Sequence, residues 1–218
     1  MKALRIKWNQ FLELAKEQSP REALLKSVGT YFHLNRVVVP VYNDLTALKQ
    51  DVPEEGSLEF VIVDRENADS VTSMNRIVSR RLKQTYNTQS GYYAYAVVAN
   101  GEIIGDIWCA SPEKVKRTPI HHDLSWLGIE CGEREAYMFD MYVAPKFRGK
   151  VVTGFLLGNA LGHLKKSGFH RVYGFYEKSN LPALWVHRLF GYTELQKRKV
   201  CRVLLYQKSE ALPASGPA

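Results

Sequence analysis

The chain has 218 residues, of which 45% are hydrophobic, and its formal net charge is +8. This composition is ordinary for a folded globular protein and argues against a fibrous or disordered chain. The positive charge favours anionic partners, such as a phosphorylated cofactor, nucleic acid or an anionic membrane surface, but it equally fits a solvated basic surface.

The three cysteines, Cys109, Cys131 and Cys201, are odd in number and widely spaced. They indicate neither a disulfide framework nor a zinc site, and they fit a reducing compartment. No apolar signal-peptide core follows the basic start of the chain, and no apolar run approaches the roughly 20 residues that span a bilayer. We therefore expect a cytoplasmic protein.

The first part of the chain predicts two helices and a strand. Residues 1–28 have apolar side chains at helical spacing, with a break at Ser19-Pro20. The first helix is basic and amphipathic, which suits an anionic membrane surface, although such a stripe is more often packed against a core. Residues 31–45 are rich in β-forming residues, and Pro40 within them points to an edge position.

The polar stretch at 51–57 contains Pro and Gly and is the expected boundary between two parts of the chain. We predict an N-terminal helical and β extension over 1–56 and a main domain over 57–208. The last residues, 209–218, are small and Pro-containing, and they predict a disordered tail.

The main domain alternates predicted strands and helices. In order these are a strand at 58–64, a helix at 67–86, a hairpin at 92–110 with Asn100-Gly101 at its turn, a long loop at 111–135, a strand at 136–145, a helix to about 167, a strand at 168–178, a short helix at 180–190 and a last strand or hairpin at 191–207. This order predicts an α/β fold with a mixed, mostly antiparallel central sheet and helices on both faces.

One stretch, YVAPKFRGKVVTGFLLGNAL at 142–161, combines the end of a strand, a basic turn and the start of a helix. The first N–H groups of a helix are unpaired and carry a partial positive charge, so such a turn can hold a phosphate. Arg148 and Lys150 add charge, Gly149 permits close backbone approach, and Thr153 offers a hydroxyl. Taken alone, such a turn is more often a solvated loop.

A second motif, NLPALWVHRLFGY at 180–192, follows at a suitable distance. The two motifs together resemble the GCN5-related N-acetyltransferase (GNAT) superfamily, and the resemblance covers roughly residues 57–208. It implies acetyl-CoA or another acyl-CoA as co-substrate, with the pyrophosphate on the turn and the pantetheine arm along the strand before it. The cofactor-binding residues that it implies are Met141, Tyr142, Val143, Arg148, Gly149, Lys150, Val151, Val152, Thr153, Asn180 and Ala183.

The chain departs from the family pattern where Val151 and Thr153 occupy positions that are usually small. A Val keeps its N–H donor if its φ is negative, so the turn can still bind a phosphate. The β-branched side chain could nevertheless crowd the pyrophosphate.

The resemblance also implies direct attack of a neutral primary amine on the thioester in a ternary complex. The N–H of Met141 or of the catalytic candidate Tyr142 would polarise the thioester carbonyl. The family's usual proton donor to the leaving thiolate is a Tyr, and His187 stands in its place here. Tyr192 and Tyr176 are nearby alternatives for that role.

Asp140 is the predicted base or ammonium-binding group. It interrupts an apolar strand two residues before Tyr142, so both side chains are expected on one face. A purely structural role for this carboxylate is the alternative, and Glu133 and Glu135 are weaker candidates for the base. No covalent acyl-enzyme is expected, because the cysteines lack an adjacent His.

The segment His121, His122 and Asp123 suggests a metal site. Adjacent side chains of an extended chain point to opposite sides, and no third ligand has a suitable spacing, so we expect no metal. We place this segment and Trp126 in an acceptor-binding loop instead.

Arg80, Arg81 and Lys83 form a basic patch on the predicted helix at 67–86. The resemblance implies that this helix often borders the acceptor site, but a solvated face is the default interpretation of the patch.

We therefore expect an N-acyltransferase that acts on a small-molecule amine or an amino sugar. The alternatives are the same fold with an acyl carrier protein as donor, which the basic surface would suit, and a non-catalytic binding module. No recognition motif supports a nucleic-acid partner. The sequence leaves open the acceptor, a homodimer and membrane contact by the first helix.

Overall fold

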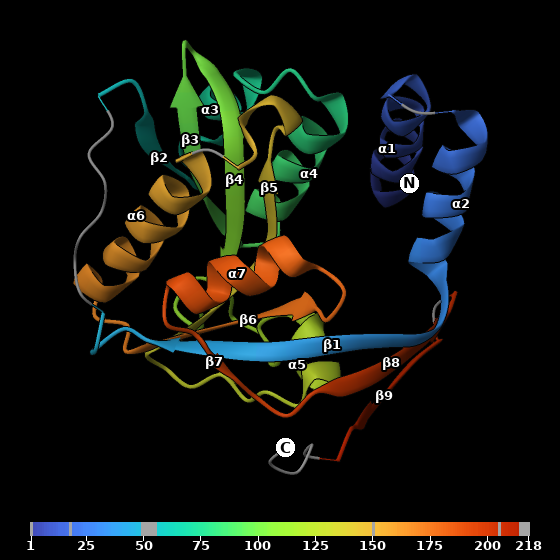
Figure 1. Cartoon of the computed structure of the whole chain (residues 1–218). Helices are drawn as coiled ribbons and strands as arrows, with labels where there is room; N and C mark the ends of the chain where they lie inside the picture. Colours follow the sequence, from blue (N-terminus) through green and yellow to red (C-terminus); the bar gives the residue numbers. More distant parts are fainter. Residues whose placement is uncertain (1, 18, 49–55, 150, 205, 214–218) are drawn as a thin grey trace.

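The computed structural model describes residues 2–17, 19–48, 56–149, 151–204 and 206–213. Within these residues the strands form one sheet in the order β2-β3-β4-β5-β6-β1-β8-β9, and β7 pairs with β1 (Figure 1). All neighbouring strands are antiparallel except β5 and β6, which are parallel. Helices flank this sheet, so the predicted mixed, mostly antiparallel α/β fold is confirmed.

The helices are α1 (Lys2–Glu17), α2 (Pro20–Tyr31), α3 (Ala68–Ser73), α4 (Val78–Gln89), α5 (His122–Leu127), the 3-10 turn η1 (Pro145–Phe147), α6 (Val152–Lys166) and α7 (Leu181–Leu189). The strands are β1 (Phe32–Asp44), β2 (Glu59–Val63), β3 (Tyr93–Ala99), β4 (Glu102–Ala110), β5 (Glu135–Val143), β6 (Arg171–Glu177), β7 (Thr193–Glu194), β8 (Arg198–Val203) and β9 (Tyr206–Ala211). None of the helices in the described part of the chain is long and apolar enough to cross a membrane.

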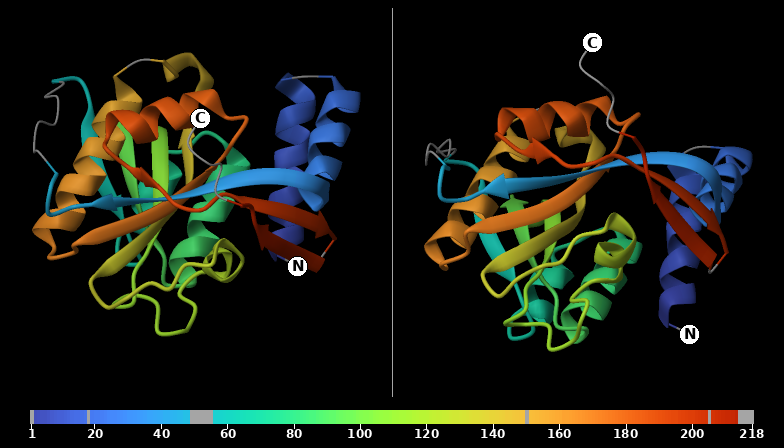
Figure 2. Two further views of the ribbon diagram at one scale, coloured as in Figure 1. Left: turned by 60° about the horizontal axis from the view of Figure 1, so that its bottom comes forward. Right: turned by 90° about the horizontal axis from the view of Figure 1, so that it is seen from below.

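The two N-terminal helices lie side by side at one end of the molecule, next to the end of the long strand β1 (Figures 1 and 2). Ser19 caps α2, because its hydroxyl accepts a hydrogen bond from the Glu22 N–H at 3.3 Å. Glu13 of α1 also acts as a cap, because its carboxylate accepts the Ser79 N–H at 2.9 Å in the first turn of α4. This contact fastens α1 to the main domain.

Strand β1 lies inside the sheet, between β6 on one side and β7 and β8 on the other. The prediction that Pro40 marks an edge was therefore wrong. Pairing of β1 with β8 ends at Val38, and pairing with β7 begins at Val41, so Pro40 falls in the interval between them. Its carbonyl accepts the Leu195 N–H at 2.8 Å on that side, and the missing N–H of Pro40 costs no ladder bond there.

The hairpin of β3 and β4 is confirmed at the predicted turn, where Asn100 and Gly101 have φ of 52° and 73°. Alternate residues of β3 enter two different cores, because successive side chains point to opposite faces of a sheet. Tyr93 and Tyr95 pack in the core that contains α6, whereas Ala94 and Ala96 pack in the core on the other face.

The single helix predicted at 67–86 is in fact two, α3 and α4. Asn75 is buried in the break, and its side-chain oxygen accepts the Ile77 N–H at 3.0 Å. This bond takes the place of a backbone hydrogen bond within the helix. The Met74 carbonyl at the same break accepts the Ile103 N–H at 3.3 Å. The break therefore docks the helical pair onto β4.

Parts of both predicted domain limits, near residue 56 and after residue 208, lie outside the described residues. The boundary stretch is outside the described residues over 49–55, and the division at residue 56 remains a prediction. Residues 209–211, which we assigned to the tail, belong to β9 and pair with β8. Residues 214–218 of the tail lie outside the described residues.

Candidate active site

Strands β5 and β6 separate near the centre of the sheet. They pair only over Glu135–Tyr137 with Arg171–Tyr173, whereas the other edge of β6 pairs with β1 over the whole of Arg171–Glu177. On its other side β5 carries a bulge, since Phe139 opposes Trp108 and Tyr142 opposes Asp106. The segment from Met141 to Val143, which we predict to lie along a pantetheine arm, is therefore beyond the paired part of β5 and β6.

The bulge is centred on Asp140, whose φ is 52°. Few non-glycine residues adopt this left-handed conformation, and Asp is among those that tolerate it best. The side chains of Asp140 and Tyr142 both contact the Arg80 guanidinium. It donates a hydrogen bond to the Asp140 carboxylate and lies 4.9 Å from the centroid of the Tyr142 ring.

The turn after β5 leads directly into α6. Gly149 has a φ of 69°, which favours glycine, and Val151 has an ordinary helical φ of −58°. Because the φ of Val151 is negative, its backbone N–H remains available to a phosphate, as the sequence-based prediction required. The first turn of α6, with Val152 and Thr153, has no side-chain cap and no acidic residue. The helix thus presents an uncapped, positively polarised N-terminus. The predicted cofactor residue Lys150 lies outside the described residues.

Arg148 folds back onto β5. Its Nε donates to the Val143 carbonyl at 2.9 Å, and its guanidinium carbon lies 6.0 Å from the centroid of the Tyr142 ring. The side chain therefore braces the turn against the strand.

Asp140 is held by two cations. Its carboxylate lies 2.9 Å from Arg80 and 2.5 Å from Lys83. Burial raises the pKa of Asp140, but Arg80 and Lys83 outweigh this effect and the pKa is lowered. Asp140 is therefore ionised at neutral pH and is a weak base.

Sequence reasoning missed Asp106, which completes this ion cluster. It is fully buried on β4, where it bonds Arg80 and accepts from Gln84 Nε2 at 2.9 Å. The feature of the sequence that could have indicated Asp106 is an acidic residue in the middle of the mostly apolar strand β4. Arg80 is only 6% exposed, so it is not part of a solvated face, whereas Arg81 is exposed.

A cavity of about 1430 Å³ adjoins this cluster. Its walls come from α1, α2, α4, β5 and the turn before α6, and they include Tyr142, Pro145 and Arg148. The cavity therefore reaches the segment of β5 that lies beyond the paired part of β5 and β6.

The second motif forms α7. Asn180 caps this helix, because its side-chain oxygen accepts the Ala183 N–H at 3.2 Å. His187 Nδ1 lies 2.6 Å from the Ala183 carbonyl, and a carbonyl can only accept, so Nδ1 carries the hydrogen. Burial also lowers the pKa of His187. The neutral ring then has no hydrogen on Nε2, which disfavours the predicted role of proton donor.

Two tyrosines surround His187. Tyr176 stacks on its ring at 5.1 Å, and Tyr192 meets it edge-on at 4.8 Å. The Tyr176 hydroxyl already donates to Glu194 at 2.8 Å. Burial raises the pKa of both tyrosines, so both remain protonated at neutral pH. Tyr192, which follows α7, also packs against the core that contains Cys109 of β4.

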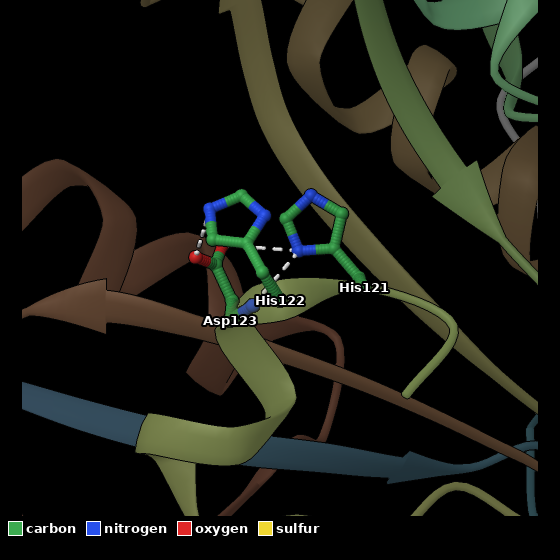
Figure 3. Close-up of side chains that lie close together, drawn as sticks. All are labelled: His121, His122 and Asp123. Carbon is green, nitrogen blue, oxygen red and sulfur yellow. Dashed lines mark hydrogen bonds and ion pairs between the residues drawn. The ribbon is translucent and has the colours of Figure 1, made fainter. Parts of the chain in front are cut away.

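His121, His122 and Asp123 lie closer together than we expected (Figure 3). The two imidazole rings are 4.4 Å apart, and the ligand atoms of the three residues lie within 4.8 Å of one another. The expectation of opposite directions was wrong, because the chain turns into α5 at His122 and the strand alternation ends there. His121 instead caps α5, with its Nδ1 accepting the Asp123 N–H at 3.2 Å.

The Asp123 carboxylate already has other donors. It accepts from Trp126 Nε1 at 3.0 Å and from the Tyr137 hydroxyl at 2.9 Å. Burial lowers the pKa of His121 to about 4, so its ring is neutral at neutral pH. These contacts hold the loop over 111–135 against the sheet. This loop lines a separate cavity of about 910 Å³, which shares no lining residue with the cavity at Tyr142.

The remaining candidates have structural contacts. Glu135 is buried, accepts from the Gly132 N–H at 2.8 Å and pairs with Arg171 at 3.2 Å. All three cysteines are free, and burial raises the pKa of the Cys109 thiol to about 12. A thiol of this kind is a poor nucleophile.

Comparisons with known proteins identify the family and the fold. The Acetyltransferase (GNAT) family matches residues 49–192, which is more than half of the chain. A comparison with curated proteins found no match.

Solved structures are similar in fold. A tandem GNAT protein from the clavulanic acid biosynthesis pathway is 15% identical with a TM-score of 0.53, covering 92% of this chain and 60% of that one. A GCN5-related glucosamine N-acetyltransferase region of a fungal multi-domain GH3 β-N-acetylglucosaminidase is 16% identical with a TM-score of 0.55, covering 88% of this chain and 23% of that one. A GCN5-related N-acetyltransferase from Sphaerobacter thermophilus is 12% identical with a TM-score of 0.51, covering 84% and 56%.

The chain spans less than two thirds of the length of the first solved structures that it matches. At these identities the likeness establishes the fold alone, and the family match covers both motifs up to Tyr192. The chain belongs to the acetyltransferase (GNAT) family.

Proposed function

We propose that this protein is an acyl-CoA-dependent N-acyltransferase, most simply an N-acetyltransferase, that acts on a primary amine of a small molecule or an amino sugar. The observation that carries the proposal is the uncapped N-terminus of α6 directly after the point where β5 and β6 separate. A helix terminus of this kind is suited to a pyrophosphate, and the edge of β5 that is not paired with β6 is suited to an extended pantetheine arm.

In the proposed reaction the acceptor nitrogen attacks the thioester carbon, the carbon–sulfur bond breaks and the acyl group passes to nitrogen. The N–H of Met141 or Tyr142 stabilises the oxyanion. The thiolate takes up a proton, and the amine loses one to water or to a nearby base.

We assign the proton donor to Tyr192 in preference to His187. Its phenol is protonated at neutral pH, whereas the neutral His187 ring has its one hydrogen on Nδ1, bonded to Ala183. His187 then acts as a positioning residue, because its ring and its carbonyl both contact Tyr192; the Tyr192 N–H donates to that carbonyl at 2.9 Å.

Asp140 supplies negative charge beside the acceptor in this proposal. Because two cations, Arg80 and Lys83, share its carboxylate, its principal effect is to hold Arg80 next to Tyr142. Direct proton abstraction by Asp140 is disfavoured by its lowered pKa.

The test is a thiol-release assay with acetyl-CoA and a panel of primary amines that includes glucosamine, since the fungal region of similar fold is described as a glucosamine N-acetyltransferase. Amine-dependent thiol release supports the proposal. Release only with an acetylated acyl carrier protein would move the donor to that partner. No turnover with either donor would favour a binding module.

A further inference from the structure

We infer that the acceptor carries an anionic group, a carboxylate or a phosphate, in addition to its primary amine, and that the cavity between α1, α4 and β5 binds that group. This inference rests on the proposed function and adds the substrate class.

The charge of the cavity wall carries the inference. Among the residues that the structure describes, the wall holds six cationic side chains and one carboxylate. The cations are Arg5, Lys7, Lys16, Arg76, Arg80 and Arg148. The one carboxylate, Glu13, is occupied in capping α4 through Ser79. The wall therefore lacks a free anion for a purely cationic amine and has an excess of groups that attract an anion.

Two of the cations are neutralised within the protein. Arg80 pairs with Asp106 and Asp140, and Arg76 pairs with Glu102. By contrast, Arg5 and Lys16 form no ion pair with any side chain that the structure describes. Both lie on α1, and both line the same cavity as Tyr142.

The position of the cavity links it to the proposed acyl transfer. Tyr142 lines it and belongs to the β5 segment that would face the thioester. On α1, Trp8 and Phe11 stack with ring centroids 5.6 Å apart and add an aromatic wall. An acceptor with an apolar body would rest on these rings, with its anionic group at Arg5 or at Lys16, which lie about three helical turns apart on α1, and its amine toward Tyr142.

The experiment compares acceptors that differ only in the anionic group. The pairs are phenylalanine with phenethylamine and glucosamine 6-phosphate with glucosamine, assayed by thiol release from acetyl-CoA. We expect the anionic member of at least one pair to have a kcat/KM about tenfold higher, and the pair that responds distinguishes a carboxylate from a phosphate. Equal or better turnover of phenethylamine and glucosamine, the two members that lack the anionic group, would overturn the inference and leave the proposed function intact.

Variants identify the groups responsible. The double variant Arg5→Gln, Lys16→Gln should lower the preference for the anionic member by about tenfold, whereas Arg21→Gln, an exposed cation of α2 outside the cavity wall, should not. If the double variant instead weakened acetyl-CoA binding and left the preference unchanged, these cations would serve the cofactor and the inference would be wrong.

A binding measurement decides the question even without turnover. Calorimetry of N-acetylphenylalanine against N-acetylphenethylamine probes the same cavity with reaction products. Tighter binding of the charged product, lost in the double variant, supports the inference. Equal binding of the two products contradicts it, whatever the outcome of the thiol-release assay.

Discussion

The Arg80 guanidinium donates to the Asp140 carboxylate at 2.9 Å and thereby joins α4 to the bulge of β5. The same guanidinium also bonds the fully buried carboxylate of Asp106. One cation thus compensates two carboxylates at the point where the strand leaves its regular register.

Replacing Arg80 by Ala should therefore destabilise the protein strongly. It leaves the buried Asp106 carboxylate without its cation, and loss of one partner of a buried pair costs roughly 3–5 kcal/mol. Chemical denaturation measures this change. The control is Arg81→Ala, an exposed neighbour on the same helix, which should change stability by less than about 0.5 kcal/mol. Equal effects of the two substitutions would contradict the account of the ion cluster.

The buried His121 should make stability fall in mild acid. Its pKa is about 4 in the folded protein and about 6.5 in an unfolded chain, so the unfolded chain binds the proton first as pH falls. The stabilisation is full above about pH 6.5 and is lost as pH falls toward 4, by about 3 kcal/mol.

The variant His121→Asn keeps a good N-cap for α5 and removes the titrating ring. Denaturation between pH 7 and pH 4 should therefore show a shallower loss for this variant than for the unmodified protein. His122, whose side chain is 77% exposed, provides the matched control as His122→Asn. A pH dependence that follows His122 and not His121 would refute the assignment.

Tyr192→Phe should lower kcat by about 10²-fold or more, because it removes the proposed proton donor without changing the packing of the ring. His187→Asn should have a smaller effect on kcat at every pH, because it leaves the Tyr192 phenol in place. The two profiles of kcat against pH are the measurement. A large loss in His187→Asn with full activity in Tyr192→Phe would return the role of donor to His187.

Thr153→Glu separates phosphate binding from folding. A carboxylate in the first turn of α6 should stabilise the helix by about 0.3–1 kcal/mol through its dipole. The same charge should repel a pyrophosphate and weaken acetyl-CoA binding at least tenfold, roughly 1.4 kcal/mol. Thr153→Gln supplies the neutral control. A variant that is more stable and still binds acetyl-CoA normally would show that this turn does not hold the phosphates.

Much of the fold was predictable because local signals agreed with the tertiary structure. The Ser19-Pro20 break, the Asn100-Gly101 turn and the capped start of α7 at Asn180 all rest on contacts between near neighbours in sequence. The break at Asn75 and the interior position of Pro40 were not predictable, because both depend on pairing with distant segments, at Ile103 and at β7 and β8.

The site was predictable in part for the same reason. The turn before α6 follows from its own residues, whereas the partners of Asp140 come from α4, some 60 residues earlier in the chain. The carboxylate in the strand and the basic patch on the helix could each be recognised, but the pairing of Asp140 with Arg80 and Lys83 could not. The role of His187 likewise depended on which atom of its ring meets the Ala183 carbonyl.

The most direct test of the account is a calorimetric titration of the unmodified protein with acetyl-CoA, repeated with desulfo-CoA. The account predicts saturable binding of both ligands at one site, because the affinity comes from the pyrophosphate on α6 and the pantetheine arm along β5. No heat of binding at millimolar ligand would mean that the site at Val151 and Thr153 does not accept coenzyme A, and it would contradict the proposed acyl-CoA-dependent function.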